Sequence, residues 1–111
     1  MGIWIGEDAK VIVQGITGKQ GHFHATKMAE FGTDVVGGCT PGKQGQKVDL
    51  EVYEVPVFGS MMTAIRETDA DATVIYVPPP FAGEAIMEAA DAFHQVKGEG
   101  VIVCITEGIP T

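Results

Sequence analysis

Short apolar runs rich in β-branched residues alternate with amphipathic stretches along the 111 residues of the chain. Such runs are typical of buried parallel strands, and the stretches between them have the periodicity of helices. Strands are predicted at residues 10–14, 33–40, 57–58, 73–77 and 100–106. The stretch 48–56 fits either a loop or an edge hairpin arm, because its residues alternate like a strand but Pro56 would interrupt a central one.

Three helices are predicted between these strands. The first lies in "KQGHFHATKMAEFG", where Phe23, Met28 and Phe31 fall on roughly one helical face and Gly32 is a stop signal. The second covers residues 61–67, with Ser60 as its N-cap. The third begins near residue 81, and the prolines before it are expected to form an entry turn rather than helix interior.

Strict alternation of five strands with three helices predicts one α/β domain over residues 1–111. The expected fold is a Rossmann-like parallel sheet of order 3-2-1-4-5, with helices on both faces. In that order Cys39 and Cys104 lie on strands separated by two others, roughly 14 Å apart, so we expect no disulfide between them. The fifth strand, "VIVCIT", is apolar on both faces and lies at an edge, which predicts self-association of the isolated chain.

The acidic composition narrows the classes of partner. Seven Lys and Arg residues against fifteen Asp and Glu give a net charge of −8, which argues against a broad nucleic-acid surface. No apolar run approaches the roughly 20 residues of a membrane span, and the N-terminus has no signal-peptide pattern. No Cys or His spacing suits a metal site. We therefore expect an intracellular protein whose anion site, if it has one, is local.

The loop "GITGKQG", directly after the first strand, is the strongest candidate for such a site. A glycine loop that enters a helix presents unpaired N–H groups and a partial positive charge, which suit a phosphate. Gly18 would allow close approach of a ligand, while Thr17, Lys19 and Gln20 add a hydroxyl, a cation and an amide. The alternative is that the loop is only a strand-to-helix turn.

Other candidate residues follow the remaining strands, because ligands of open parallel sheets bind at the carboxyl ends. No carboxylate follows the second strand, which disfavours a nicotinamide cofactor, and Lys43 is either a phosphate contact or a solvated lysine. After the fourth strand, Tyr76, Val77 and Pro78 are expected to form either an apolar wall of the site or simple core packing and a turn. After the fifth strand, Glu107 is either a site carboxylate or a helix cap or surface charge. The histidines His22, His24 and His94 show no triad or metal pattern, and we expect structural or solvent roles for them.

Several of these segments together resemble one family. The blocks "VIVQGITGKQG", "FH", "VVGG", "TPGK", "PVF", "VIYVPPPF", "AIMEAADA" and "ITEGIP" occur in the order seen in the N-terminal CoA-binding domain of the succinate–CoA ligase α subunit family. Malate–CoA ligase and part of ATP-citrate lyase share them. Lys19 departs from the small polar residue common there, and the connections 44–55 and 94–100 look longer than in typical members.

The resemblance implies that coenzyme A lies across the carboxyl edge of the sheet. The family's CoA contacts fall on Thr17, Gly18, Lys19, Gln20, Lys43, Ile105, Thr106 and Glu107. It further implies an acyl-CoA ligase that forms a thioester from a carboxylic acid, CoA and ATP or GTP through a phosphohistidine outside this chain. The implied partner is a ligase β subunit with an ATP-grasp nucleotide site.

None of the three histidines occupies the place of the phosphohistidine, so this chain should contain no catalytic residue and be inactive alone. The expected location is the cytoplasm, or the mitochondrial matrix in a eukaryote. Two alternatives stay open. One is a stand-alone protein that binds or senses CoA without catalysis, and the other, disfavoured, is a nicotinamide oxidoreductase domain.

Overall fold

The computed structural model describes residues 9–76 and 79–104. Strands and helices alternate along these residues as predicted, except that three strands follow one another between the first and second helices. In chain order they are β1 (Lys10–Gln14), α1 (Lys19–Glu30), β2 (Asp34–Cys39), β3 (Lys47–Asp49), β4 (Glu54–Phe58), α2 (Met61–Thr68), β5 (Ala72–Ile75), α3 (Pro79–Val96) and β6 (Val101–Cys104).

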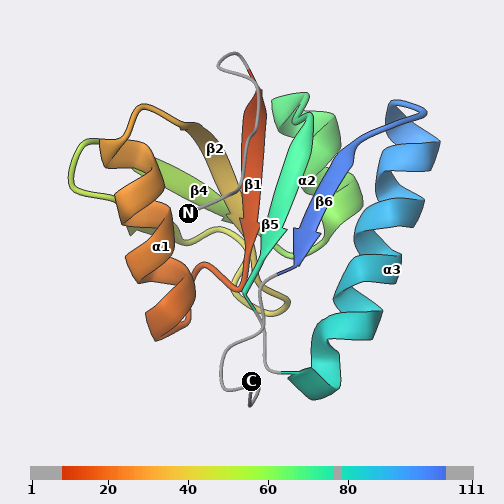
Figure 1. Cartoon of the computed structure of the whole chain (residues 1–111), viewed down its shortest axis with the longest axis horizontal. Helices are drawn as coiled ribbons and strands as arrows, with labels where there is room; N and C mark the ends of the chain where they lie inside the picture. The colour runs from red at the N-terminus through yellow and green to blue at the C-terminus, as the bar shows by residue number, and fades with distance from the viewer. Residues whose placement is uncertain (1–8, 77–78, 105–111) are drawn as a thin grey trace.

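The sheet has the order β3-β4-β2-β1-β5-β6 (Figure 1). Its five neighbouring strands from β4 to β6 are parallel, which confirms the predicted order 3-2-1-4-5. β3 adds an antiparallel edge, pairing Lys47 with Pro56 and Asp49 with Glu54. The hairpin arm is therefore the correct alternative for this stretch, and it places Pro56 in the second strand from the edge.

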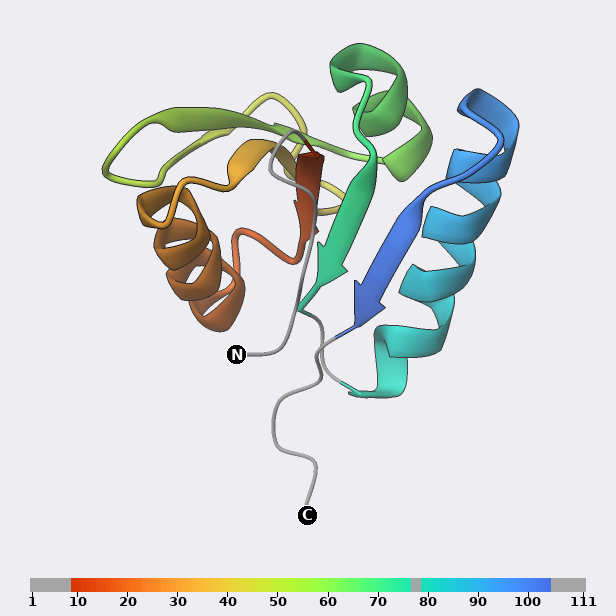
Figure 2. The same cartoon turned by 45° about the horizontal axis from the view of Figure 1, so that its top comes forward.

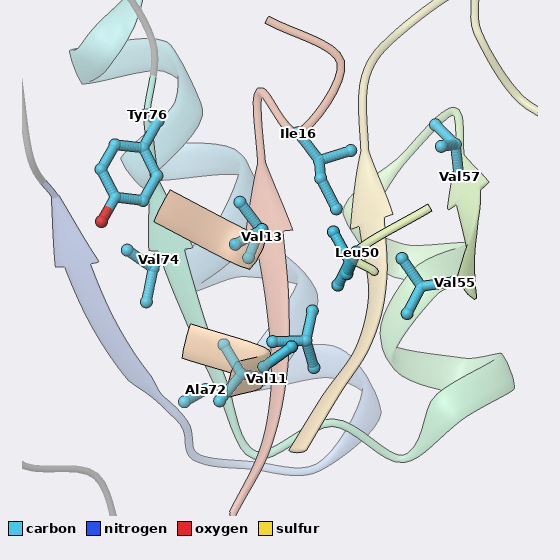
Figure 3. Packing of buried hydrophobic residues seen from close by; sticks show 12 residues of the cluster. Val11, Val13, Ile16, Leu50, Val55, Val57, Ala72, Val74 and Tyr76 are labelled. Carbon is cyan, nitrogen blue, oxygen red and sulfur yellow. The ribbon is translucent and has the colours of Figure 1, made fainter. Parts of the chain in front are cut away.

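Helices cover both faces of the sheet, as expected for this fold class (Figures 1 and 2). On one face α1 packs through Ala25 and Ala29 over a core that includes Val11, Val13 and Val74 (Figure 3). The second core, on the opposite face, joins the sheet to α2 and α3; its members include Ile12, Met61, Ile65, Ala89 and Phe93.

The buried face of α1 is not the one on which Phe23, Met28 and Phe31 fall. Phe23 is 53% exposed and Phe31 is 87% exposed, while only Met28 of the three is packed against the core. The residues that α1 buries are instead small: Gly21, Ala25, Thr26 and Ala29. The cause is the short distance between helix and strand, since a Cβ atom at Gly21 would lie 2.1 Å from the Gly15 carbonyl oxygen.

The starts of α2 and α3 follow their capping chemistry. Ser60 accepts a hydrogen bond from the Thr63 N–H, confirming it as the N-cap of α2, and the Glu88 carboxylate of α3 accepts another from the Met61 N–H at 2.9 Å. α3 begins at Pro79, two residues earlier than predicted, so two prolines form its first turn rather than a separate entry turn. Proline is tolerated there because the first-turn N–H groups have no partner within a helix.

The β3–β4 hairpin is anchored to the body of the domain rather than projecting from it. Leu50 is fully buried in the core under α1. The Tyr53 hydroxyl donates to the Thr33 carbonyl at 2.8 Å and accepts from the Val35 N–H at 3.0 Å, which ties the hairpin to the start of β2. His22 Nε2 lies 2.8 Å from the Asp49 carbonyl oxygen and links the hairpin to α1.

Among the described residues, β5 ends one residue earlier than expected, because Tyr76 is not part of it. β5 covers Ala72–Ile75, and β6 covers Val101–Cys104; the predicted continuations to residues 77 and 106 fall outside the described residues. Cys39 and Cys104 are both free, as predicted from their separation across the sheet.

Asp71 joins three elements at the amino edge of the sheet. Its carboxylate accepts from the Lys10 N–H at 3.0 Å and from the Lys97 ammonium at 2.9 Å, and its carbonyl accepts from the Val101 N–H. The Lys97 ammonium also lies 3.0 Å from an Asp69 carboxylate oxygen. The hydrogen bonds from Lys10 and Lys97 lower the pKa of the Asp71 carboxyl from its ordinary value of 3.8.

This shift makes the contribution of Asp71 to stability depend on pH. A carboxyl whose pKa is lower in the folded state stabilises the fold fully above its ordinary pKa and loses that effect as the pH falls below this value and through the lowered pKa. Asp71→Asn should therefore lower the free energy of unfolding by about 1 kcal/mol at neutral pH, a modest value because water screens a half-exposed pair. Urea unfolding should show the difference from wild type shrinking as the pH falls below the ordinary pKa of 3.8. Glu67→Gln, on the exposed side of α2, is the control, and a difference independent of pH would contradict the assignment.

A second prediction concerns the close contact between α1 and the end of β1. Gly21→Ala should lower the free energy of unfolding by about 2 kcal/mol or more, because the added carbon meets the Gly15 backbone rather than a flexible side chain. Gly83→Ala is the matched control, since a Cβ there meets nothing within 4 Å and alanine favours a helix. If Gly21→Ala is as stable as Gly83→Ala in urea unfolding, the contact is looser than described.

Candidate functional site

The candidate site lies where the strand order reverses. From β1 the chain passes through α1 to β2 and β4 on one side, whereas β5 and β6 lie on the other side of β1. The carboxyl ends of β1, β5 and β6 point to the same edge of the sheet, and α1 begins beside it (Figure 2). Open parallel sheets bind ligands in the crevice at such a reversal.

The loop between β1 and α1 has the geometry of a tight strand-to-helix turn. Gly15 has a φ of 84°, a conformation that glycine adopts readily, and its N–H donates to the Cys39 carbonyl at 3.0 Å. The Gly18 N–H donates back to the Gly15 carbonyl at 3.0 Å. Gly21 then lets α1 pass directly against this carbonyl, so Gly15 and Gly21 have structural reasons, whereas a Cβ atom at Gly18 would only make a tight contact at 3.3 Å from the same oxygen.

The N-terminus of α1 is suited to an anion. Gly18 is the N-cap and supplies no side-chain acceptor to the first turn, and this described turn contains no Asp or Glu. The early N–H groups of a helix have no partner within the helix, and its dipole adds partial positive charge. Thr17, Gly18, Lys19 and Gln20 are all exposed here, so a ligand can reach this end of the helix.

Lys43 is positioned by two consecutive turns after β2. Its N–H donates to the Thr40 carbonyl at 3.1 Å, with Pro41 and Gly42 between them and Gly42 at a φ of 85°. This is the pattern of a type II turn. The Lys43 carbonyl in turn accepts from the Gln46 N–H at 3.2 Å, which fixes the backbone while the side chain stays exposed.

Hydrogen bonds bring the ends of three strands together. The Thr17 hydroxyl of the glycine loop donates to the Thr40 hydroxyl at 3.1 Å, which joins the loop to the turn that carries Lys43. On the other side of β1, the Tyr76 N–H donates to the Gln14 carbonyl at 2.9 Å. The predicted site residues after β1, β2 and β5 are therefore neighbours in the fold.

His24, for which the sequence analysis expected a structural or solvent role, lies in this region. Its ring stacks on the Tyr76 ring, with centroids 4.7 Å apart and planes 4° apart. Tyr76 is only 8% exposed and lies beyond Val74 on the α1 face of the sheet (Figure 3). The spacing held a signal, because His24 is one helical turn beyond Gly21 and so falls on the side of α1 that approaches the sheet.

A cavity of about 310 Å³ adjoins the site on the face covered by α3. Its lining combines the ends of β1 and β2 with the first turns of α3: Gln14, Gly15, Cys39, Thr40, Pro41, Phe81, Glu84, Ala85 and Glu88. The two carboxylates make it a poor place for a phosphate. Any phosphorylated ligand is therefore favoured at the α1 end of the edge and disfavoured in this cavity.

The Cys39 thiol in this cavity is not a nucleophile. It is 3% exposed, and burial together with the nearby Glu88 carboxylate raises its pKa to about 12. A thiol with so high a pKa stays protonated at neutral pH, and the thiolate is the reactive form.

Five of the predicted site residues lie outside the described residues: Val77, Pro78, Ile105, Thr106 and Glu107. Within the described ranges, no group of three or more His, Cys, Asp or Glu side chains is arranged to hold a metal ion. Among the helices described, none has the length and apolarity that a membrane crossing requires.

The sequence matches known proteins over nearly its whole length. Residues 6–108 match the family described as CoA binding domain. The chain is 56% identical over 110 residues to a protein named succinate–CoA ligase [ADP-forming] subunit alpha 2 of Archaeoglobus fulgidus, an alignment that covers 99% of this chain and 35% of the relative. The alpha subunits named for the same enzyme in Aquifex aeolicus and Staphylococcus aureus are 52% and 47% identical, with 99% of this chain and 33% of each relative covered.

The extent of these matches sets what they establish. The chain spans about a third of the length of these relatives. The family model covers almost all of the chain, including the glycine loop, the turn with Lys43 and the end of β5. The chain therefore belongs to the CoA binding domain family.

Proposed function

We propose that this chain is the CoA-binding part of an acyl-CoA ligase α subunit and holds coenzyme A at the carboxyl edge of its sheet. The observation that carries the proposal is the open N-terminus of α1, with Gly18 as an N-cap that offers no side-chain acceptor. Phosphate groups are the ligands that such a helix end binds best. CoA carries a diphosphate and a 3′-phosphate, and such separate phosphate groups can each be bound by a local positive charge.

Two lysines lie where those phosphates would be. Lys19 begins α1, and Lys43 lies on the turn that the Thr17–Thr40 hydrogen bond holds beside the glycine loop. In a chain of net charge −8 these local cations offset the general repulsion of an anionic ligand. We assign one phosphate group to the α1 N-terminus with Thr17, Lys19 and Gln20, and the 3′-phosphate to Lys43.

The rest of the ligand would run along the strand ends towards β6. We assign the pantetheine arm to the region that begins at Tyr76 with Val77 and Pro78 and continues to Ile105, Thr106 and Glu107. The support for these positions is the family resemblance together with the location of Tyr76 beside the end of β1. When bound, CoA supplies the thiol that becomes acylated, and this chain's residues hold and orient it.

The whole reaction is proposed from the relatives. They are named as alpha subunits of succinate–CoA ligase [ADP-forming], which supports a ligase that joins a carboxylic acid to CoA at the expense of a nucleotide. We propose that the phosphohistidine lies outside this chain and that a β subunit with an ATP-grasp site provides the nucleotide. The proposed location is the cytoplasm, or the mitochondrial matrix in a eukaryote.

A nicotinamide cofactor fits the same edge less well. In such domains an acidic residue at the end of the second strand binds the ribose hydroxyls. Here β2 ends at Cys39, followed by Thr40 and the turn to Lys43. Two acidic side chains, Glu84 and Glu88, come from α3 and line the cavity on the opposite face.

Calorimetric titration of CoA tests the proposal through Lys43. We expect CoA to bind, more weakly as salt rises, and NAD not to bind under the same conditions. Lys43→Met should weaken CoA binding roughly fivefold, as expected for one exposed charge pair, and should leave the affinity for dephospho-CoA unchanged. Lys47→Met, on the exposed edge strand β3, is the matched control.

Gly18→Val tests the helix end itself. Gly18 has φ −78° and ψ 160°, which valine adopts readily, and its Cβ would lie 3.3 Å from the Gly15 carbonyl oxygen, a tight contact that a small shift of this exposed loop relieves. The fold should therefore persist, with a wild-type circular dichroism spectrum, while the side chain blocks the phosphate position. If Gly18→Val binds CoA with wild-type affinity, the loop is only a structural turn. Equal binding of CoA and dephospho-CoA by the wild type would remove the assignment of the 3′-phosphate.

Self-association of the isolated chain is proposed at the edge strand β6. Within the described residues β6 pairs with β5 alone, its sequence is uncharged, and Val101 is 53% exposed. Bare apolar edges of this kind invite pairing with another chain. Light scattering at rising concentration should show dimers that Val101→Lys reduces and Val52→Lys, equally exposed on the hairpin at 56%, does not. A monomer at about millimolar concentration, or equal effects of the two lysines, would contradict this.

A further inference from the structure

We propose that His24 is a positioning residue for CoA binding: by stacking on Tyr76, its ring fixes the distance between the two sides of the crevice. The inference rests on the proposed function, because it assumes that CoA occupies this edge. It adds to the site a residue within α1 that lies outside the glycine loop and the strand ends.

His24 and Tyr76 lie on opposite sides of the reversal in strand order. α1 belongs to the half of the domain that runs from β1 to β2, whereas Tyr76 directly follows β5 in the other half. The strand order reverses between these halves, and this is where the crevice of such a sheet opens. α1 packs on β1 and β2, and the stack of His24 on Tyr76 extends its contacts across the reversal.

The stack of His24 on Tyr76 is held on more than one side. The two rings are nearly parallel, and the Phe23 ring contacts His24 edge-on, with centroids 5.3 Å apart and planes 83° apart. The imidazole is thus held by an aromatic ring on each of two sides. Tyr76 is 8% exposed, so its ring has little freedom to move away from α1.

Both residues of the stack are connected to the proposed ligand position. The Tyr76 N–H donates to the Gln14 carbonyl, and Gln14 directly precedes the glycine loop. His24 itself lies in the same helix whose N-terminus would hold a phosphate. A displacement of Tyr76 would therefore change the separation between the phosphate end of the site and its apolar wall, and CoA would have to restore it on binding.

The experiment replaces the ring of His24 with and without an aromatic substitute. His24→Leu and His24→Gln remove the stack, and His24→Phe keeps a flat ring of similar size. We expect the first two to weaken CoA binding roughly two- to tenfold, in line with the strength of an aromatic pair, and His24→Phe to remain close to wild type. His94→Leu, on the exposed side of α3, is the matched control and should bind CoA like wild type.

A spectroscopic measurement separates positioning from general stability. In proton NMR of the free protein, a ring stacked on Tyr76 shifts the resonances of the Tyr76 ring protons. This shift should persist in His24→Phe and disappear in His24→Leu and His24→Gln. Binding is measured well below each melting temperature, so that every variant is folded.

The outcomes distinguish this inference from the proposed function. If the wild type does not bind CoA, the proposed function fails and this inference with it. If the wild type binds CoA and either His24→Leu or His24→Gln binds as tightly, the proposed function stands and the role of His24 is wrong. Equal weakening by His24→Phe and His24→Leu would also overturn it, because the flat ring would then not be the cause.

Discussion

The close approach of α1 to the carbonyl group of Gly15 is the constraint on which the domain depends. A side chain at Gly21 would collide with that carbonyl, so the helix can lie this near only because position 21 is glycine. The approach then decides which face of α1 is buried, since Ala25 and Ala29 fit against the sheet and larger side chains do not. It also places the start of α1 directly beside the end of β1, where a ligand of the sheet would bind.

The electrostatics of the carboxyl edge are divided between its two faces. On the α1 side, the described first turn of the helix contains no acidic residue, and the exposed Lys19 and Lys43 add positive charge. Both features favour phosphate. On the α3 side Glu84 and Glu88 line a cavity and favour neutral or positively charged groups. This division would orient an elongated anionic ligand without requiring a positively charged protein, and it agrees with membership of a CoA binding domain family.

Most of the architecture could be predicted because it follows from local patterns. Apolar runs marked the parallel strands, Ser60 marked the start of α2, and the spacing of Gly15, Gly18 and Gly21 marked the loop. The failures arose where distant contacts decide the outcome. Phe23 and Phe31 are exposed because of a helix-to-strand distance that no periodicity encodes, and the stack of His24 on Tyr76 joins residues 52 positions apart.

The central claim is that the N-terminus of α1 receives a phosphate of CoA, and backbone amide shifts on CoA addition test it most directly. If the claim is right, the largest changes in a nitrogen–proton correlation spectrum will fall on Gly18, Lys19 and Gln20, with smaller ones at Lys43. Changes concentrated on α3 around Glu84 and Glu88, with the glycine-loop amides unmoved, would contradict it.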